Sequence, residues 1–224
     1  MPGPTAGRGE VFPLRSYTPA PVGRTPASAR RRRGILGGTF DPPHLGHVIA
    51  AEAVRRRLGL DEVVLVVAHD PWQKSGDRAV TAPELRLAMT QLAVAGHDGL
   101  VVSDLELRRG GPTFTVDTLE TMRAAHPDDD LVLILGEDAA AGIETWHRAA
   151  DLPALCQVVV VCRPGVDVTL PDGWPFVRVD IDAADVSSTA VRSAVAAGAD
   201  VRRLVPDEVG SFIVEHGLYR VGLA

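Results

Sequence analysis

Apolar runs alternate with amphipathic stretches over most of the chain. Runs rich in Val, Ile and Leu lie at residues 34–37, 63–67, 100–102, 131–135, 158–161 and 176–179. The clearest are VVLVV at 63–67 and LVLIL at 131–135, whose continuous apolar character is typical of strands covered on both faces. Each run predicts one strand of a sheet.

Stretches with helical periodicity separate these runs. The first is expected to begin near His44 and to end at Gly59, a residue type that favours the position just past a helix. Further helices are expected near residues 85–92, 115–125, 188–197 and 206–216. Strands that alternate with helices are the signature of a parallel sheet, so the expected fold class is α/β.

The N-terminal segment differs from the rest of the chain. It is rich in Pro, Gly and Ser and ends in four arginines, Arg30–Arg33, but it lacks the apolar middle of a secretory signal. We interpret residues 1–33 as a disordered extension, 34–220 as one domain and 221–224 as a tail. A basic, acid-poor leader could also be a targeting peptide. No apolar run approaches the ~20 residues of a membrane span, and a cytoplasmic location is expected.

The charge balance narrows the possible ligands. The 224 residues carry a formal net charge of −6, with 46% hydrophobic and 23% charged residues. General nucleic-acid binders present a basic face, so no nucleic acid is expected as a partner, and no membrane either. A phosphate site needs only local positive potential, so this net charge is compatible with ATP binding.

The two cysteines, Cys156 and Cys162, fall on one expected strand. Six residues apart on a strand, they would be separated by about 20 Å. A disulfide requires Cα atoms within roughly 7 Å of each other. We therefore expect two buried, reduced thiols.

Three distinctive segments follow expected strand ends, at Gly37, Ala68 and Gly136. In open α/β sheets ligands bind beyond the carboxyl ends of the strands, so one shared site is expected. Gly37 and Gly38 lack Cβ atoms, which lets backbone N–H groups approach a phosphate closely. The helix that follows adds free N–H groups and the positive end of its dipole.

Two histidines stand on the first turn of that helix. His44 and His47 are three residues apart and could donate hydrogen bonds to phosphate oxygens. A pair at this spacing can also ligate zinc, although the sequence offers no evident third ligand nearby. Phosphate binding is the interpretation that agrees with the position at a helix N-terminus.

Residues 186–192 (VSSTAVR) have the composition of a second helix start. Ser and Thr ahead of an apolar-periodic run favour a helix N-terminus, where free N–H groups can bind phosphate. Arg192 follows about one turn later, where a fixed cation can reach the β- and γ-phosphates of ATP. The alternative is an ordinary helix start with a solvated arginine.

Two whole segments resemble one superfamily. Residues 37–47 (GGTFDPPHLGH) resemble the signature of the adenylyltransferases related to class I aminoacyl-tRNA synthetases. Residues 186–192 resemble their Ile-Ser-Ser-Thr-x-Ile-Arg segment, with Val at both Ile positions. The resemblance covers residues 34–220 and implies a Rossmann-like, doubly wound parallel sheet of the nucleotidyltransferase type, with a small helical C-terminal part.

Other segments resemble the nicotinate-mononucleotide adenylyltransferases within that superfamily. They are residues 109–119 (RGGPTFTVDTL), 136–138 (GED) with Trp146, 71–74 (PWQK) and 163–165 (RPG). The resemblance implies that Thr115 lies against the nicotinate and that Trp146 stacks on its ring. It also implies that Lys74 offers a cation to the mononucleotide and that Arg163 reaches a phosphate. The alternatives are that Trp146 is a half-buried core aromatic, that Lys74 is solvated and that Arg163 has a structural role at a strand end.

The same resemblance implies an ATP site. Its members are Gly37, Gly38, Thr39, Phe40, His44, His47, Gly136, Asp138, Ser188, Thr189 and Arg192. Two positions depart from the family pattern, because Ala68 stands where Pro is usual and Glu137 where Ala or Gln is usual. Ala68 bears on the geometry of the family's substrate loop, to which residues 71–74 correspond, and Glu137 brings a negative charge near the site.

The expected function is adenylyl transfer from ATP to nicotinate mononucleotide, giving deamido-NAD and pyrophosphate. His44, His47 and Arg192 are the expected catalytic residues. Mg²⁺ is expected to be carried by the ATP phosphates, without a metal site made by the protein. The alternatives are a sister enzyme acting on nicotinamide mononucleotide or phosphopantetheine, and a non-catalytic nucleotide-binding module. The sequence does not distinguish a monomer from a homo-oligomer.

Overall fold

A six-stranded parallel sheet forms the centre of the structure, a computed structural model that describes residues 30–71, 80–163, 168–181 and 186–220. Each strand pairs in parallel with its neighbours. The strands are β1 (Arg32–Gly38), β2 (Glu62–Val67), β3 (Leu100–Ser103), β4 (Asp130–Gly136), β5 (Gln157–Cys162) and β6 (Phe176–Asp180). All six predicted strands are confirmed.

The strand order is β3-β2-β1-β4-β5-β6. The chain therefore starts at the centre, winds outward to β3, crosses back to β4 and winds outward again to β6. This is a doubly wound sheet, and its winding direction reverses between β1 and β4. The α/β fold predicted from the sequence is confirmed, and the reversal marks the place where such sheets bind ligands.

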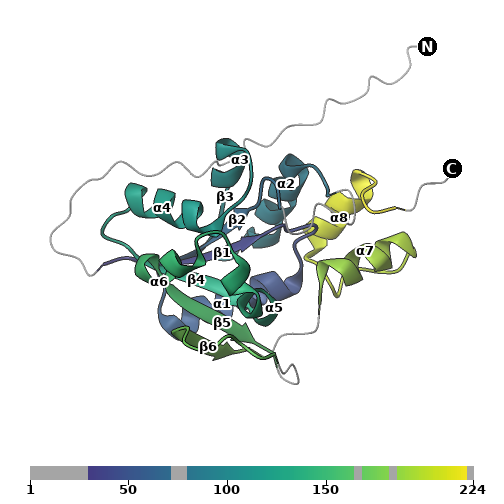
Figure 1. Cartoon of the computed structure of the whole chain (residues 1–224). Coiled ribbons are helices and arrows are strands. Elements are labelled where there is room, and N and C mark those ends of the chain that lie inside the picture. Colours follow the sequence, from purple (N-terminus) through teal and green to yellow (C-terminus); the bar gives the residue numbers. More distant parts are fainter. Residues whose placement is uncertain (1–29, 72–79, 164–167, 182–185, 221–224) are drawn as a thin grey trace, which may run out of the picture.

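Helices cover both faces of this sheet (Figure 1). The helices of at least nine residues are α1 (Leu45–Leu58), α2 (Pro83–Val94), α4 (Thr115–Ala125), α7 (Ser188–Ala196) and α8 (Asp207–Glu215). They confirm the five predicted helices, with ends shifted by one or two residues in most cases. Within the described ranges, no helix has both the length and the apolar character to span a membrane.

Shorter helices lie between these elements and were not predicted. They are α3 (Leu105–Arg109), α5 (Glu137–Ala141) and α6 (Leu152–Leu155), with the 3₁₀ turns η1 (Ile143–Thr145) and η2 (Ala149–Asp151). None exceeds five residues. A helix this short shows too few turns for its periodicity to stand out in a sequence.

The core consists of two apolar clusters, one on each face of the sheet. In the first, Leu36 and Leu65 of the strands pack with residues of α1, α2, α7 and α8. In the second, Ile35 and Val64 pack with residues of α4, η1 and α6. Consecutive residues of one strand thus enter opposite clusters, as the alternation of side chains along a strand requires.

The first strand begins at Arg32, two residues before the boundary expected at Gly34. Arg33 is only 2% exposed and forms ion pairs with Glu62 and with Asp129, whose Oδ2 lies 2.8 Å from Nη2. A buried guanidinium is stable here because two carboxylates neutralise it. Arg32 and Arg33 therefore belong to the folded domain, and the expected extension of residues 1–33 is too long at its C-terminal end.

Both cysteines are free thiols; Cys156 directly precedes β5 and Cys162 is its last residue. Cys162 is buried as expected, whereas Cys156 is half-buried. Burial raises the pKa of the Cys156 thiol to about 11. This thiol is therefore protonated, and correspondingly unreactive, at neutral pH.

Candidate functional site

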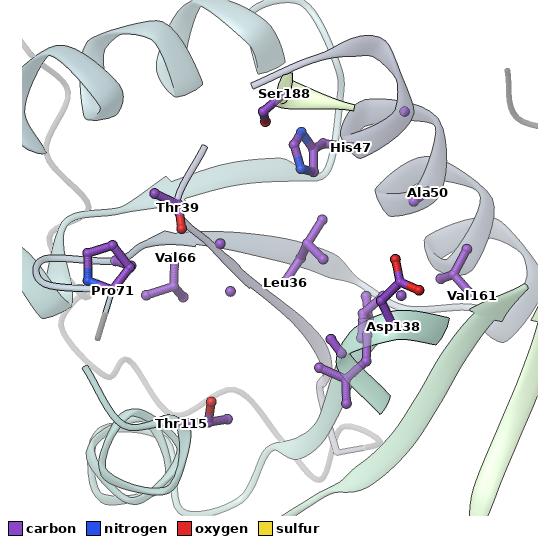
Figure 2. Close-up of a pocket in the computed structure, with 18 of the residues that line it drawn as sticks. Leu36, Thr39, His47, Ala50, Val66, Pro71, Thr115, Asp138, Val161 and Ser188 are labelled. Carbon is purple, nitrogen blue, oxygen red and sulfur yellow. The ribbon is translucent and has the colours of Figure 1, made fainter. Parts of the chain in front are cut away.

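A cavity of about 770 Å³ opens at the carboxyl ends of β1 and β4, where the winding of the sheet reverses (Figure 2). The segments around it come from the turn after β1 and from the N-terminal ends of α1, α4, α5 and α7. The predicted site residues that line it are Gly37, Gly38, Thr39, His44, His47, Thr115, Gly136, Asp138, Trp146, Arg163, Ser188, Thr189 and Arg192. The sequence correctly predicted that these segments converge.

The turn at Gly37 and Gly38, called the glycine turn below, packs against the ring of Phe40. A Cβ on Gly38 would stand 2.9 Å from the Phe40 ring, so only glycine fits at this approach. Phe40 is 2% exposed, adopts a left-handed φ of 49° and belongs to the apolar core. It was expected to border ATP, but its side chain does not line the cavity. Its ring meets that of His47 edge-on, with the centroids 5.0 Å apart, and so supports the site from below.

Ala68 fastens the same turn to the neighbouring strand end. Its N–H donates a hydrogen bond of 2.9 Å to the carbonyl oxygen of Gly38. A proline at this position would lack the N–H that this bond requires. The departure from the family pattern therefore adds one hydrogen bond to the turn in this chain.

The two histidines are held against each other at the start of α1. Their rings stack with centroids 3.6 Å apart, and a Cβ on Gly46 would stand 3.0 Å from Nδ1 of His44. The backbone N–H of His44 donates to Nδ1 of His47 at 3.1 Å. Because Nδ1 accepts this bond, the proton of a neutral His47 ring is on Nε2. His47 therefore offers an Nε2–H donor at a helix N-terminus, where anions are favoured.

Arg192 lies on the second turn of α7 and is held there by two hydrogen bonds. Its Nη1 donates to the backbone carbonyl of Asp41 at 2.8 Å, and its Nη2 donates to Oγ1 of Thr189 at 2.9 Å. The guanidinium thus connects α7 with the glycine turn. Arg192 lines the same cavity as the histidines, so its guanidinium places a permanent positive charge there.

The start of α7 is bound to the same turn. Ser187 is the N-cap residue, and its Oγ accepts from the N–H of Ala190 at 3.1 Å. Ser188 Oγ donates to the carbonyl of Pro42 at 2.8 Å. The N–H groups of the first helical residues have no partner within a helix, which makes this end of α7 suited to bind phosphate.

Thr115 and Trp146 also line the cavity, and the residues next to them, Phe114 and His147, have ring centroids 4.3 Å apart. Thr115 is the first residue of α4, and in Figure 2 it stands on the opposite side of Thr39 from His47 and Ser188. Trp146 is half-buried, packs against the second core cluster and contributes to the cavity lining. A hydroxyl and an indole in one cavity suit a small planar ring with a polar substituent.

Glu137, the second departure from the family pattern, is buried and paired with other groups of the protein. It is 4% exposed, and its Oε2 accepts from the N–H of Arg163 at 3.2 Å. Its Oε1 lies 3.7 Å from Nη2 of Arg178 on β6. The negative charge that departs from the family pattern is thus paired by protein groups. Asp138, next in the chain, is exposed at the cavity wall.

A second buried carboxylate, Glu106, also reaches the cavity lining. It is 4% exposed and accepts a hydrogen bond from the hydroxyl of Thr118. Burial raises the pKa of Glu106 above its ordinary value, while the hydrogen bond from Thr118 and the charge of Arg109 act in the opposite direction. Glu106 thus connects α3 to α4, the helix that begins at Thr115.

Arg86 joins the glycine turn to the ends of the segment that contains Lys74. It is 1% exposed and donates to the carbonyl oxygens of Thr39 at 2.7 Å, Thr81 at 2.8 Å and His69 at 3.1 Å. One planar guanidinium thus holds three backbone segments in a fixed arrangement. Lys74 itself lies outside the described residues, so its predicted role stays a prediction.

Within the described part of the chain, no group of three or more His, Cys, Asp or Glu side chains is arranged to hold a metal ion. The cavity is instead lined by the guanidinium of Arg192, the two histidines and the start of α7 with its backbone N–H groups. Such donors bind anions.

Comparison with known proteins agrees with this geometry. The cytidylyltransferase-like family matches residues 35–194. A probable nicotinate-nucleotide adenylyltransferase of Clavibacter michiganensis subsp. michiganensis is 44% identical over 199 residues, which are 88% of this chain and 98% of that protein. Another, from Streptomyces coelicolor, is 46% identical over 188 residues, which are 83% and 99% of the two chains. The chain belongs to the nicotinate-nucleotide adenylyltransferase family.

The fold also matches a solved structure. The Plasmodium falciparum nicotinic acid mononucleotide adenylyltransferase complexed with NaAD has a TM-score of 0.73 and 19% identity, covering 87% of this chain and all of that one. The fold of this adenylyltransferase-family chain is therefore shared across a wide sequence distance.

Sequence reasoning missed three residues that hold the adenylyltransferase site together: Asp41, Arg86 and Glu106. Asp41 was part of the quoted motif, but its partners Tyr219, Thr81 and Arg192 are distant in the sequence, so no local pattern revealed its role. Arg86 and Glu106 are charged residues within or beside amphipathic helices, where a solvated position is the usual expectation. Arg86 lies on the same helix face as Met89 and Ala93, both buried, and a charged residue on that apolar face was a usable signal.

Proposed function

We propose that this chain transfers the adenylyl group of ATP to nicotinate mononucleotide, with deamido-NAD and pyrophosphate as products. The observation that carries the proposal is that one cavity is lined by two chemically different sets of residues, which we call the phosphate wall and the pyridine wall. His44, His47 and Arg192 line the first and suit a triphosphate, while Thr115 and Trp146 line the second and suit a pyridine ring.

The reaction is a direct displacement at phosphorus. An oxygen of the mononucleotide 5′-phosphate forms a bond to the α-phosphorus of ATP, and the bond from that phosphorus to the bridging oxygen of pyrophosphate breaks. No group of the protein has to form a covalent bond. Catalysis then rests on holding the two substrates in line and on neutralising charge that develops on the pyrophosphate.

Each wall has a distinct task in this reaction. Nε2–H of His47, the guanidinium of Arg192 and the first N–H groups of α7 bind the β- and γ-phosphates, so they stabilise the leaving group. Trp146 stacks on the pyridine ring, and Thr115 binds its carboxylate. Asp138, exposed at the cavity wall, is placed to accept from ribose hydroxyls.

We propose that Mg²⁺ arrives with ATP, held by phosphate oxygens and water, as is common for this ion. Its contribution is to neutralise phosphate charge. The nitrogen donors of His47 and Arg192 fit the phosphates that carry such an ion.

The test is a pyrophosphate-release assay with ATP and each of three acceptors: nicotinate mononucleotide, nicotinamide mononucleotide and phosphopantetheine. The expected result is fastest release with nicotinate mononucleotide. Faster turnover of another acceptor would assign the chain to a sister activity. Absence of turnover with all three would leave a nucleotide-binding module and refute the proposal.

A further inference from the structure

The C-terminal end of the domain reaches the glycine turn. After α8 the backbone reverses through Gly217 and Tyr219, whose φ angles of 62° and 61° are both left-handed. A bulky residue rarely adopts this conformation and keeps it only where its surroundings hold it. The Tyr219 hydroxyl donates a hydrogen bond of 2.7 Å to Oδ1 of Asp41, 178 residues earlier in the chain.

Asp41 is the point where several segments meet. It is 1% exposed, and its Oδ2 lies 3.5 Å from the donating N–H of Thr81, at the start of the segment leading into α2. Its backbone carbonyl accepts the hydrogen bond from Nη1 of Arg192. The side chain of Asp41 thus faces Tyr219 and Thr81, while its main chain holds the arginine of the cavity wall.

The Tyr219 hydroxyl is suited to this task because it stays protonated. Burial is the largest cause that raises the pKa of Tyr219, and the nearby Asp41 carboxylate raises the pKa further. A protonated hydroxyl donates to a carboxylate at all ordinary pH values, and such charge-assisted hydrogen bonds are stronger than neutral ones.

A second contact joins the C-terminal part to the site. The carbonyl of Leu204, in the segment between α7 and α8, accepts from the N–H of Leu45, the first residue of α1. The start of α1, which carries the two histidines, is therefore bound to the segment between α7 and α8. Leu204 acts through its backbone carbonyl, whereas Tyr219 acts through a side-chain hydroxyl that one substitution removes.

We propose that Tyr219 is a positioning residue for Arg192. It holds Asp41 in the orientation that presents the backbone carbonyl to the guanidinium, so the C-terminal residues determine how firmly the site binds the outer phosphates of ATP. This inference rests on the proposed function only in assigning those phosphates to Arg192. Tyr219 itself does not line the cavity and touches no substrate.

The test is equilibrium binding of ATP and of AMP to Tyr219→Phe, measured by titration calorimetry. This variant lacks one oxygen atom and keeps the ring. We expect ATP to bind about tenfold more weakly, the order of effect for one hydrogen bond to a charged group, with AMP affinity unchanged. AMP lacks the phosphates that Arg192 is proposed to bind, so the difference between the two nucleotides isolates the arginine from a general loosening of the fold.

Two further proteins complete the experiment. Ser211→Ala removes a hydroxyl from α8 that donates only to the carbonyl of Asp207, and we expect wild-type affinities for both nucleotides. In Arg192→Ala, adding Tyr219→Phe is expected to change ATP affinity no further, because the two residues act on one interaction. Equal weakening of ATP and AMP, or additive losses in the double variant, would overturn the inference.

The result also separates the inference from the proposed function. If wild-type protein makes deamido-NAD and Tyr219→Phe binds ATP normally, the inference is wrong and the function stands. If the expected binding differences occur but no acceptor is adenylylated, the function is wrong and the positioning role stands. If wild-type protein does not bind ATP, both are wrong.

Discussion

The His47 ring carries two roles on its two nitrogens. Nδ1 accepts from the backbone of His44 and so caps the start of α1, while Nε2–H is the donor that we propose for a phosphate. Gly46 permits this arrangement because any Cβ there would press on the His44 ring. The spacing of the two histidines is thus explained by stacking of their rings at a helix start, and the proposed phosphate contact uses the other ring nitrogen of His47.

Replacing His47 with Ala should affect both roles. We expect kcat/KM for ATP to fall by roughly 10²- to 10³-fold, the usual effect of removing one donor to a developing negative charge. We also expect the free energy of unfolding to fall by about 1 kcal/mol from the lost cap. Steady-state kinetics and urea denaturation measure the two effects.

The matched control for that experiment is His97→Ala. His97 pairs with Glu52 at 2.8 Å and does not line the cavity, so its removal should leave kcat/KM unchanged. Similar losses of activity in both variants would show that His47 has no specific part in catalysis.

Trp146 gives a prediction for the pyridine wall. Stacking of an aromatic side chain on a base contributes about 1–3 kcal/mol, so Trp146→Ala should raise KM for nicotinate mononucleotide roughly tenfold or more. KM for ATP should change less than about twofold if the two walls act separately. Initial-rate kinetics with each substrate varied in turn measure both constants.

Trp174 provides the comparison, because it stacks on Phe176 and does not line the cavity. Trp174→Ala removes the same side chain and should leave both KM values near those of wild type. A larger rise of the ATP constant than of the mononucleotide constant in Trp146→Ala would contradict the assignment of this wall.

At the scale of elements, long and strongly patterned segments were predictable and short ones were not. The strands β2 and β4 are continuous apolar runs because both of their faces are covered. By contrast, α3 and α5 have five residues each, and tertiary contacts rather than intrinsic propensity stabilise helices of that length. Glu106, in α3, shows such a contact through its hydrogen bond from Thr118 in α4.

The raised pKa of Glu106 predicts a pH dependence of stability. The folded state disfavours the ionised carboxylate, so the stabilisation by its protonated form is present below the ordinary pKa of 4.5 and is lost as pH rises through the raised pKa. Glu106→Gln is neutral at every pH and keeps that stabilisation. Its free energy of unfolding, relative to wild type, should therefore increase as pH rises above 4.5 toward neutrality.

Urea denaturation of both proteins between acid and neutral pH measures this difference. Glu144, an exposed residue of η1, provides the control, and Glu144→Gln should show no comparable rise with pH. A difference between Glu106→Gln and wild type that stays constant with pH would mean that burial of this carboxyl has no energetic consequence.

At the scale of the whole molecule, the sequence predicted an α/β fold but not the boundary at its start. Four consecutive arginines resemble a solvated charge run, and only the fold brings Glu62 and Asp129 to Arg33 from other parts of the chain. The central strand β1 is therefore fixed at its beginning by an ion-pair cluster as well as by its two neighbours. Long-range partners of this kind cannot be predicted from local pattern.

We predict that a chain beginning at Arg30 keeps the activity and thermal midpoint of the full chain, since β1 and its ion pairs remain. Arg33→Met in the full chain should instead lower the free energy of unfolding by about 3–5 kcal/mol, because it leaves two largely buried carboxylates without their cation. Differential scanning calorimetry and urea denaturation measure both variants. Loss of activity in the shorter chain would show that residues 1–29 contribute to function.

The account rests on direct transfer between two substrates bound in one cavity, and labelled ATP tests this most directly. The protein is incubated with ATP carrying ³²P at the α-position or at the γ-position, with and without nicotinate mononucleotide, and products and protein are separated. We predict that α-label passes to deamido-NAD only when the mononucleotide is present, that γ-label leaves in pyrophosphate, and that neither label stays on the protein. Label bound to the protein, or α-label released as AMP regardless of the mononucleotide, would contradict the account.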